Sequence, residues 1–452
     1  MIEDDEFVAF YRDSLKTVRG RDLVEWLRLR LTRAHGGASY KALIMGHSGV
    51  GKTTEMTRLV RELGSSFHAI RFSSSEQLDP VSFQPFDVLL LMISEVIQKT
   101  SLPVGEGGAG KRPSGEVLRP VLDWYSSIRT MERQSTEAGA SAEAGAGLSA
   151  DSLWSKVLGV FGRVRAEMKY ASTREKETVE YRLSRLDDLI RAANAVFREC
   201  NLLLRAATGA AEWMFIGEDF DKAGIPPETT ERLFLTYSNM FRELDVHMIF
   251  SLPIALGYSE RAPGLPVSSD DIFCLPDTMV FTPDHQAHAE GRLALRIVLA
   301  ARIAENLFGP EQMEQLIVAS GGNLRDLFSL VSYAADSALL RESAVIEVPD
   351  VSAAIRNLRK DFENRLGQSP YDVLSRCAIT YEQKAERLMK IYDQDPLARI
   401  PGPELYSLLH ARAVQEFNGE RWFGVHPLVV DILAAQGRIH PSQGGRVVGG
   451  TE

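Results

Sequence analysis

Two short stretches of the sequence carry residue types suited to phosphate chemistry. The first, from Gly46 to Thr53, reads GHSGVGKT and fits the pattern G-x-x-x-x-G-K-[ST]. In such a loop the glycines let several backbone N–H groups face one phosphate, the following helix adds partial positive charge, and the lysine reaches the β- and γ-phosphates. We therefore predict a loop that holds a nucleoside triphosphate, with the hydroxyl of Thr53 as a ligand of Mg²⁺.

The neighbours of this loop support the interpretation. The apolar run YKALIM precedes it and reads as a buried strand, while TTEMTRLVREL has the pattern of a helix. A strand, a glycine-rich turn and a helix in this order are the context that a phosphate-binding loop requires. The residues expected to contact the nucleotide are Gly46, His47, Ser48, Gly49, Val50, Gly51, Lys52, Thr53 and Thr54.

The second stretch, MFIGEDFDK, starts at Met214 and places acidic residues at the end of a predicted strand. Phosphoryl transfer needs one carboxylate to hold Mg²⁺ through water and another to orient the attacking water. We assign Glu218 to the metal and Asp219 to the water. The reverse assignment stays open because glutamate is one methylene longer. The alternative is a polar strand end that faces solvent, and Asp221 with Lys222 is expected in a turn or a helix cap.

Apolar runs and helical patterns along the chain predict the elements that position these residues. Strands are expected over residues 40–46, 67–74, 213–218 and 245–256, and helices over 21–33, 53–63, 86–100, 178–197, 292–308, 310–320, 325–340, 381–394 and 403–413. Strands that alternate with helices predict a parallel sheet. Residues 102–150 are rich in Gly, Ala, Ser and Glu, so we expect an insertion with two mobile linkers around one short helix.

The pattern changes near the C-terminus, where VQEFNGERWFGV alternates around Asn418 and predicts a hairpin after two helices. We therefore predict an α/β fold: the parallel sheet core of a P-loop NTPase, a helical lid and a C-terminal winged-helix-like domain. The expected boundaries are 1–285 for the core, 286–367 for the lid, 368–440 for the winged domain and 441–452 for a disordered tail.

A family resemblance follows from four stretches taken in order. GHSGVGKTTEM, MFIGEDFDK, HMIFSLPIAL and SGGNLRDLFSLV resemble bacterial AAA+/STAND-type ATPases, in the branch near the Orc/Cdc6-like and signal-transduction NTPases, over about residues 21–367 without the insertion. The resemblance implies ATP and Mg²⁺ as cofactors, a polar sensor at Ser251 and a lid arginine at Arg325. The alternatives are an ordinary strand-terminal serine and an ion pair of Arg325 with a carboxylate of the lid.

Two further points come from the same resemblance. The family usually has Asp-Asp or Asp-Glu where this chain has Glu218 and Asp219, and this departure puts the turnover rate, more than binding, in question. Oligomeric relatives complete the site with an arginine from the next subunit. Arg261 and Arg242 are the possible donors in this chain, and the sequence does not choose between them.

Composition limits the remaining classes. The chain has 452 residues, enough for two or three domains, and a net charge of -10 that gives no general reason to expect nucleic-acid binding. Residues 401–440 hold four acidic and three basic side chains, so a protein partner is favoured over DNA there. The three cysteines lack metal-ligand spacing and are expected to be buried apolar residues. With no signal-peptide pattern and no membrane-length apolar run, a cytoplasmic protein is expected.

Three functions fit these observations. The first is an ATP-hydrolysing switch that couples nucleotide state to partner recruitment or self-assembly as a homo-oligomer. For this branch in bacteria, the resemblance implies signalling or phage defence. The second is an Orc/Cdc6-like ATPase that binds DNA through the winged domain. The third is an ATP-bound scaffold with negligible turnover.

Overall fold

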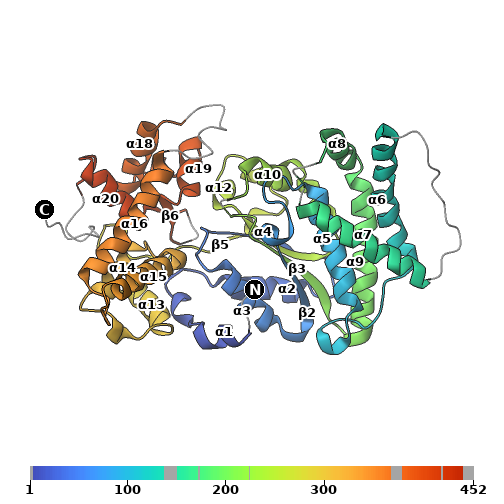
Figure 1. The fold of residues 1–452 in the computed structure, drawn as a ribbon, viewed down its shortest axis with the longest axis horizontal. Coiled ribbons are helices and arrows are strands. Elements are labelled where there is room, and N and C mark those ends of the chain that lie inside the picture. Colours follow the sequence, from blue (N-terminus) through green and yellow to red (C-terminus); the bar gives the residue numbers. More distant parts are fainter. Residues whose placement is uncertain are drawn as a thin grey trace.

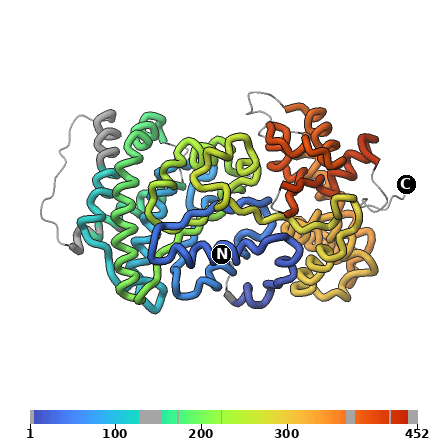
Figure 2. The backbone as a smooth tube through the Cα atoms, turned by 180° about the vertical axis from the view of Figure 1, so that it is seen from behind, coloured from blue at the N-terminus to red at the C-terminus, as the bar shows by residue number. Residues whose placement is uncertain are grey.

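The computed structural model describes residues 4–136, 150–169, 171, 174–222, 224–367, 379–418 and 421–440. The molecule is elongated, with a sheet in the middle, a bundle of long helices at one end and the C-terminal third of the chain at the other (Figure 1). The view from behind shows the same three parts in one row (Figure 2). The predicted tail lies outside the described residues.

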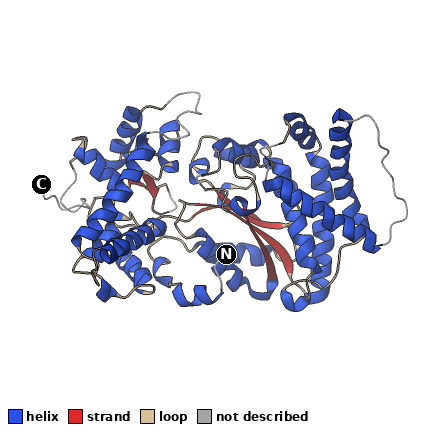
Figure 3. Ribbon diagram, viewed as in Figure 1, coloured by secondary structure: helices blue, strands red, loops and turns tan. Residues whose placement is uncertain are grey.

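A parallel sheet organises the centre of the molecule (Figure 3). Its strands are β1 (Lys41–Met45), β2 (Phe67–Ser73), β3 (Glu212–Glu218), β4 (His247–Leu252) and β5 (Ile272–Cys274), in the order β2-β3-β4-β1-β5. All pairings are parallel, so every strand ends at the same edge of the sheet. The loop after β1 and the acidic segment after β3 therefore meet at one edge. The predicted α/β P-loop NTPase fold is confirmed.

Helices cover both faces of this sheet. On one face, α2 (Leu23–Ala34) and α3 (Lys52–Leu63) pack together against β1, and Asp22 caps the first of them by accepting hydrogen bonds from two backbone N–H groups. On the other face, α5 (Pro85–Ser101) and α9 (Leu186–Thr208) contact β2 and β3, respectively. The short β5 was not predicted, because three residues give too little alternation to detect.

The insertion is more ordered than its composition predicts. In the first predicted linker, residues 105–115, most side chains are exposed but two positions pack closely: Ala109 is 4% exposed, and a Cβ on Gly108 would lie 2.0 Å from the carbonyl oxygen of Leu102. The predicted short helix is α6 (Gly115–Thr136), which packs on α9 through buried residues including Trp124. The second predicted linker lies mostly in residues 137–149, outside the described residues.

Two helices after the insertion differ from expectation. The unpredicted α7 (Ala150–Lys169) buries Val157, Phe161, Val164 and Met168, which lie on one face at helical spacing. The helix expected over residues 178–197 is two helices, α8 (Lys176–Ser184) and α9, which meet at Arg185. The helices α5, α6, α7 and α9 pack together as a four-helix layer beside the sheet.

The C-terminal third of the chain contains a helical lid and a C-terminal domain, which we define as residues 379–440. The lid consists of α13 (Ala289–Ala300), α14 (Gln312–Ala319), α15 (Leu324–Leu340) and α16 (Val348–Gly367). The C-terminal domain consists of α18 (Tyr381–Tyr392), α19 (Pro403–His410), β6 (Val414–Glu416), β7 (Phe423–Val425) and α20 (Pro427–Ala435). The two strands form the predicted antiparallel hairpin.

Shorter helices complete the chain. They are α1 (Asp4–Phe10), α4 (Ser74–Gln77), α10 (Pro227–Glu231), α11 (Ser238–Glu243) and α12 (Ile254–Gly257). Of the cysteines, Cys200 is buried as expected, whereas Cys274 packs against the core but is only partly buried and donates to the carboxylate of Glu416. Cys377 lies outside the described residues. In the described part of the chain, no helix is long and apolar enough to cross a membrane.

Gly217 of β3, the residue before the acidic segment, packs closely against the adjacent strand. A Cβ on Gly217 would lie 2.6 Å from the ring of Phe250 on the adjacent strand. We expect Gly217→Ala to lower the free energy of unfolding by about 1–3 kcal/mol, because the ring has to move within a packed core. Urea unfolding followed by circular dichroism measures the change. Gly162→Ala, where a Cβ meets no atom within 4 Å, is the control; equal stability of the two variants would contradict the prediction.

Candidate nucleotide site

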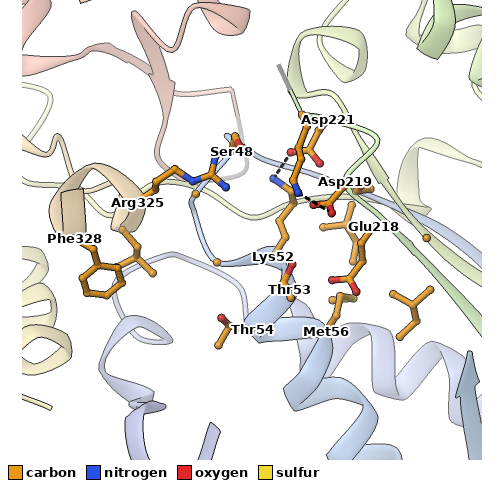
Figure 4. Close-up of a pocket in the computed structure, with 18 of the residues that line it drawn as sticks. Ser48, Lys52, Thr53, Thr54, Met56, Glu218, Asp219, Asp221, Arg325 and Phe328 are labelled. Atoms are coloured by element: carbon orange, nitrogen blue, oxygen red, sulfur yellow. Dashed lines mark hydrogen bonds and ion pairs between the residues drawn. The ribbon is translucent and has the colours of Figure 1, made fainter. Parts of the chain in front are cut away.

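A cavity of about 530 Å³ opens at the carboxyl edge of the sheet, between the core and the lid. Figure 4 shows Lys52 in its middle, with Ser48 and Arg325 on one side and the carboxylates of the acidic segment on the other. Its lining includes Ser48, Gly49, Gly51, Lys52, Thr53, Thr54, Gly217, Glu218, Asp219, Asp221, Ser251, Arg325 and Phe328. The structure thus brings most of the predicted site residues to one cavity.

The predicted phosphate loop has the backbone that its glycines allow. Gly46, Gly49 and Gly51 have φ values of 153°, 90° and 108°, a region that L side chains rarely adopt. Three predicted contact residues do not line this cavity with the others. Val50 is buried in the core beside α3, and Gly46 and His47 line a second cavity on the side of the C-terminal domain.

Lys52 is paired with a carboxylate that the sequence analysis placed in a turn or cap. Its Nζ lies 2.7 Å from Asp221 Oδ2 and donates to the carbonyl oxygens of Gly46 at 2.8 Å and His47 at 3.0 Å. The side chain of Asp221 is only 7% exposed, so this ion pair is shielded from water. The signal available in the sequence was a third acidic residue within one turn after the strand. Asp221 is therefore part of the site.

Glu218, predicted to face the metal, forms a bidentate ion pair with Arg71 of β2. Arg71 Nη2 and Nε lie 2.8 and 3.0 Å from Glu218 Oε2, and Nη2 lies 3.0 Å from Oε1. The same guanidinium donates to Thr57 Oγ1 at 2.8 Å and to the carbonyl oxygen of Thr53 at 3.3 Å. A positive side chain thus occupies both oxygens of the carboxylate next to Thr53. Sequence reasoning missed Arg71 because nothing in its own strand marks it.

Asp219 is the carboxylate of the strand end that points into the cavity with hydroxyl neighbours. Its Oδ2 accepts from Ser73 Oγ at 2.5 Å and Ser75 Oγ at 3.2 Å, and lies 2.9 Å from Lys222 Nζ. Burial alone would raise the pKa of Asp219, but hydrogen bonds from Ser73 and Lys222 hold that pKa below its usual range. Its φ of 69° turns the chain away from the strand. The carboxylate is therefore ionised and fixed at neutral pH.

Ser251 stands at the end of β4, opposite Ile44 of β1. Its Oγ accepts a hydrogen bond from the backbone N–H of Phe220 at 2.9 Å, which ties β4 to the turn that carries Asp219. A hydroxyl that accepts one bond still has its own proton to donate. Ser251 thus positions the acidic segment and retains a donor that lines the cavity.

The lid reaches the phosphate loop directly. Asn323 caps α15 and also donates to the carbonyl oxygen of Ser48 at 3.2 Å. Arg325 Nη1 donates to Ser48 Oγ at 2.6 Å, and the Arg325 backbone N–H donates to the carbonyl oxygen of Gly49 at 3.2 Å. Among the described residues, Arg325 forms no ion pair with a carboxylate, so the alternative expectation for this residue is not realised. A Cβ on Gly49 would lie 2.3 Å from Arg325 Cβ, so only glycine fits.

The C-terminal domain reaches the same loop, which the sequence analysis did not anticipate. Arg412 Nη1 donates to the carbonyl oxygen of Ser48 at 3.3 Å, and its Nη2 lies 3.0 Å from Asp326 Oδ1 of α15. His47 is enclosed at this junction. Burial first, and then the charges of Arg412 and Lys52, lower the pKa of His47 to about 3. His47 is consequently neutral at physiological pH.

The two predicted donors of a trans arginine are both engaged within the chain. Arg261 is exposed and pairs with Glu231. Arg242 donates to the carbonyl oxygens of Gly264 at 3.2 Å and Leu265 at 2.9 Å. Arg261, with its freer position, is the better candidate of the two for contact with another copy.

The donor set for Mg²⁺ is compatible with an ion held jointly with a nucleotide. Thr53 lines the cavity and its hydroxyl has no hydrogen-bond partner among the described residues. The described residues hold no group of three or more His, Cys, Asp or Glu side chains arranged around one metal position. Mg²⁺ commonly takes one or two protein oxygens and completes its shell with phosphate oxygens and water. Thr53 with an acidic side chain from residues 218–219 meets that need.

Comparisons with known proteins give structural neighbours only. No protein-family model and no curated protein matches the chain. Among solved structures, the Orc1 protein of Aeropyrum pernix in complex with DNA is similar over 96% of this chain and 86% of its own, with a TM-score of 0.40 and 14% identity. Cdc6p from Pyrobaculum aerophilum is similar over 96% and 99%, with a TM-score of 0.37 and 10% identity.

A third neighbour is the ORC2 protein of Aeropyrum pernix in its ADPNP–ADP complexes, which is similar over 92% of this chain and 94% of its own, with a TM-score of 0.40 and 11% identity. All three identities lie far below the level at which function is shared by descent. We therefore derive the function from the geometry of this site.

The Arg71 pair predicts how the chain responds to Mg²⁺. Replacing Arg71 with Met removes a positive charge beside Glu218, the carboxylate predicted to hold the metal. We therefore expect the Mg²⁺ concentration that gives half of the maximal gain in ADP affinity to fall about threefold to tenfold. Calorimetric titrations of ADP at increasing Mg²⁺ measure this value. Arg71→Lys, which keeps the charge, is the control and should resemble the wild type. An unchanged or higher requirement in Arg71→Met would show that Glu218 needs Arg71 to face the metal.

Proposed function

We propose that the chain is an ATP-binding and ATP-hydrolysing molecular switch. The observation that carries this proposal is one cavity that combines a phosphate loop, its lysine, a fixed ionised carboxylate and an arginine of the lid. Each of these parts has a role in phosphoryl transfer to water. The choice of ATP over GTP rests on the resemblance described above.

The residues divide the chemical work. The N–H groups of the loop and Lys52 bind the phosphates, and Arg325 lies 2.6 Å from a hydroxyl of that loop, close enough to contact the terminal phosphate from the lid. Asp219 accepts hydrogen bonds at its Oδ2 and is ionised, so it can orient water or take its proton. Ser251 holds the turn that carries Asp219. Thr53 and an acidic side chain of residues 218–219 would hold Mg²⁺, which would offset the negative charge of the phosphates.

The switch is built on Ser48. Its carbonyl oxygen accepts from Asn323 of the lid and Arg412 of the C-terminal domain, and its hydroxyl accepts from Arg325. A phosphate that recruits Arg325 changes the set of bonds on Ser48, and with it the anchoring of the C-terminal domain. A two-state element of this kind couples ligand state to an exposed surface. We propose that this surface, in a winged-helix-like domain, recruits a protein partner or another copy. A setting in bacterial signalling or phage defence is what the resemblance alone implies.

The wild type and two variants test whether the protein hydrolyses ATP. We expect the wild type to bind ATP with Mg²⁺ and to turn it over, Asp219→Asn to bind ATP but to lose at least about a hundredfold in turnover, and Lys52→Ala to lose binding. Calorimetry measures binding, and phosphate release over a range of protein concentrations measures turnover. A specific activity that rises with concentration would indicate a site shared between copies.

The contradicting result is specific. If the wild type binds ATP but shows no turnover at any protein concentration, the chain holds ATP as a scaffold and hydrolysis is not part of its function. Full turnover by Asp219→Asn would assign the water to another carboxylate, and Asp221 would be the next to replace.

Hydrogen exchange tests the switch itself. We expect the amides of residues 409–416 to exchange at rates that differ about tenfold between the chain with ADP and the chain with a nonhydrolysable ATP analogue, because Arg412 links this segment to Ser48. Arg412→Gln should abolish the difference. Arg438→Gln removes an arginine of the same domain that pairs with Glu382 at the surface, and it should leave the difference intact. Equal exchange in both nucleotide states of the wild type would rule out this coupling.

A further inference from the structure

A second cavity, of about 510 Å³, lies on the other side of the phosphate loop, bounded by the core, the end of α16 and the end of α19. Four cationic side chains line it: Lys222 from the core, Arg325 and Arg365 from the lid, and Arg412 from the C-terminal domain. Asp221 is the one carboxylate among the described residues that line it. The proposed nucleotide chemistry does not use Arg365, and no role for this cavity follows from the phosphate loop.

Part of this charge is neutralised by pairs that already exist. Lys222 lies 2.9 Å from a carboxylate oxygen of Asp219, and Arg412 lies 3.0 Å from one of Asp326. Asp221, the carboxylate of the lining, is itself 2.7 Å from Nζ of Lys52. These pairs account for two of the four cations of the lining and leave no carboxylate for the other two.

Arg325 and Arg365 are those two cations. Arg325 donates through its guanidinium to the neutral hydroxyl of Ser48. Arg365 lies over the ring of Phe362 at 5.3 Å, and in the described part of the chain it has no hydrogen bond and no ion pair. Two guanidinium groups from one lid therefore face a shared space, and neither forms an ion pair with a carboxylate of the described residues, although the charges of Asp326 and Asp361 act on Arg365 from a greater distance. Arginine forms strong, paired hydrogen bonds to phosphate oxygens.

The groups around Arg365 show that positive charge is concentrated there. Burial, and then the charge of Arg412, lower the pKa of Arg365. Burial, followed by the charges of Arg365 and His47, lowers the pKa of His410 to about 4. An anion bound in this cavity would stabilise the charged form of Arg365, because it would offset the repulsion from Arg412.

We propose that the second cavity is a binding site for a phosphate-type dianion, held by Arg325 and Arg365 with Arg412 at its edge. The dianion has two possible sources, free inorganic phosphate or the terminal phosphate of a nucleotide at the loop, because the two cavities share Ser48, Asp221, Lys222 and Arg325. An anion at this position contacts the lid and the C-terminal domain together. It therefore adds to the contacts that Ser48 of the phosphate loop already makes with both.

The test titrates inorganic phosphate into the full chain saturated with ADP and Mg²⁺, at constant ionic strength set by chloride. Calorimetry is expected to detect one phosphate per chain in the wild type. Arg365→Gln should weaken this binding about tenfold or more, because a charge-assisted contact is lost. Arg356→Gln, an exposed arginine on the same helix that does not line the cavity, is the matched control and should bind like the wild type. Arg365→Lys keeps the charge and should retain most of the affinity.

A parallel titration distinguishes the two sources. If phosphate does not bind beside ADP, but Arg365→Gln weakens a nonhydrolysable ATP analogue about tenfold and leaves ADP unchanged, the dianion is the terminal phosphate of the nucleotide. If folded Arg365→Gln matches the wild type in both titrations, the proposal is wrong. The steady-state turnover of the wild type is measured separately. Absence of turnover would contradict the proposed ATPase function but would not affect the conclusion about phosphate binding in this cavity.

Discussion

The close contact between the phosphate loop and the first turn of α15 is the constraint on which the site depends. Because the Cβ of Arg325 occupies the space beside Gly49, the loop can carry only glycine there, and the lid cannot tilt without losing the bond from the Arg325 backbone N–H to the Gly49 carbonyl oxygen. This contact places the Arg325 guanidinium beside Ser48, and it makes the lid part of the phosphate site rather than a separate cover.

The charges of the site are arranged as pairs within the chain. Glu218 is held by Arg71, Asp219 by Lys222 and Asp221 by Lys52. A shielded ion pair that loses one partner leaves an uncompensated charge, which costs more than the pair contributes. Binding of a triphosphate is therefore an exchange: phosphates that take Lys52 release Asp221, and Mg²⁺ that approaches Glu218 competes with Arg71. The affinity of the site is the difference between new and broken pairs.

Local patterns in the sequence were sufficient for some of this arrangement. The phosphate loop and the strands before Ser48 and Asp219 are specified by residues next to one another, and the predicted fold is confirmed. Arg71 and Glu218 are 147 residues apart, and Arg412 and Ser48 are 364 apart, so neither contact leaves a local signal. The ordered start of the insertion was missed because composition does not show that a glycine is needed for close packing.

Ser48 occupies a position that the phosphate-loop pattern leaves free, and this freedom explains how the loop is connected to the rest of the chain. The invariant glycines, lysine and threonine are fixed by what phosphate and Mg²⁺ require, so they cannot also be adapted to a neighbouring domain. A variable position can. Here its hydroxyl meets Arg325 and its carbonyl oxygen meets Asn323 and Arg412. Contacts between domains are thus made at Ser48, four residues before Lys52, and they leave the side chains of Lys52 and Thr53 free for the phosphates and Mg²⁺.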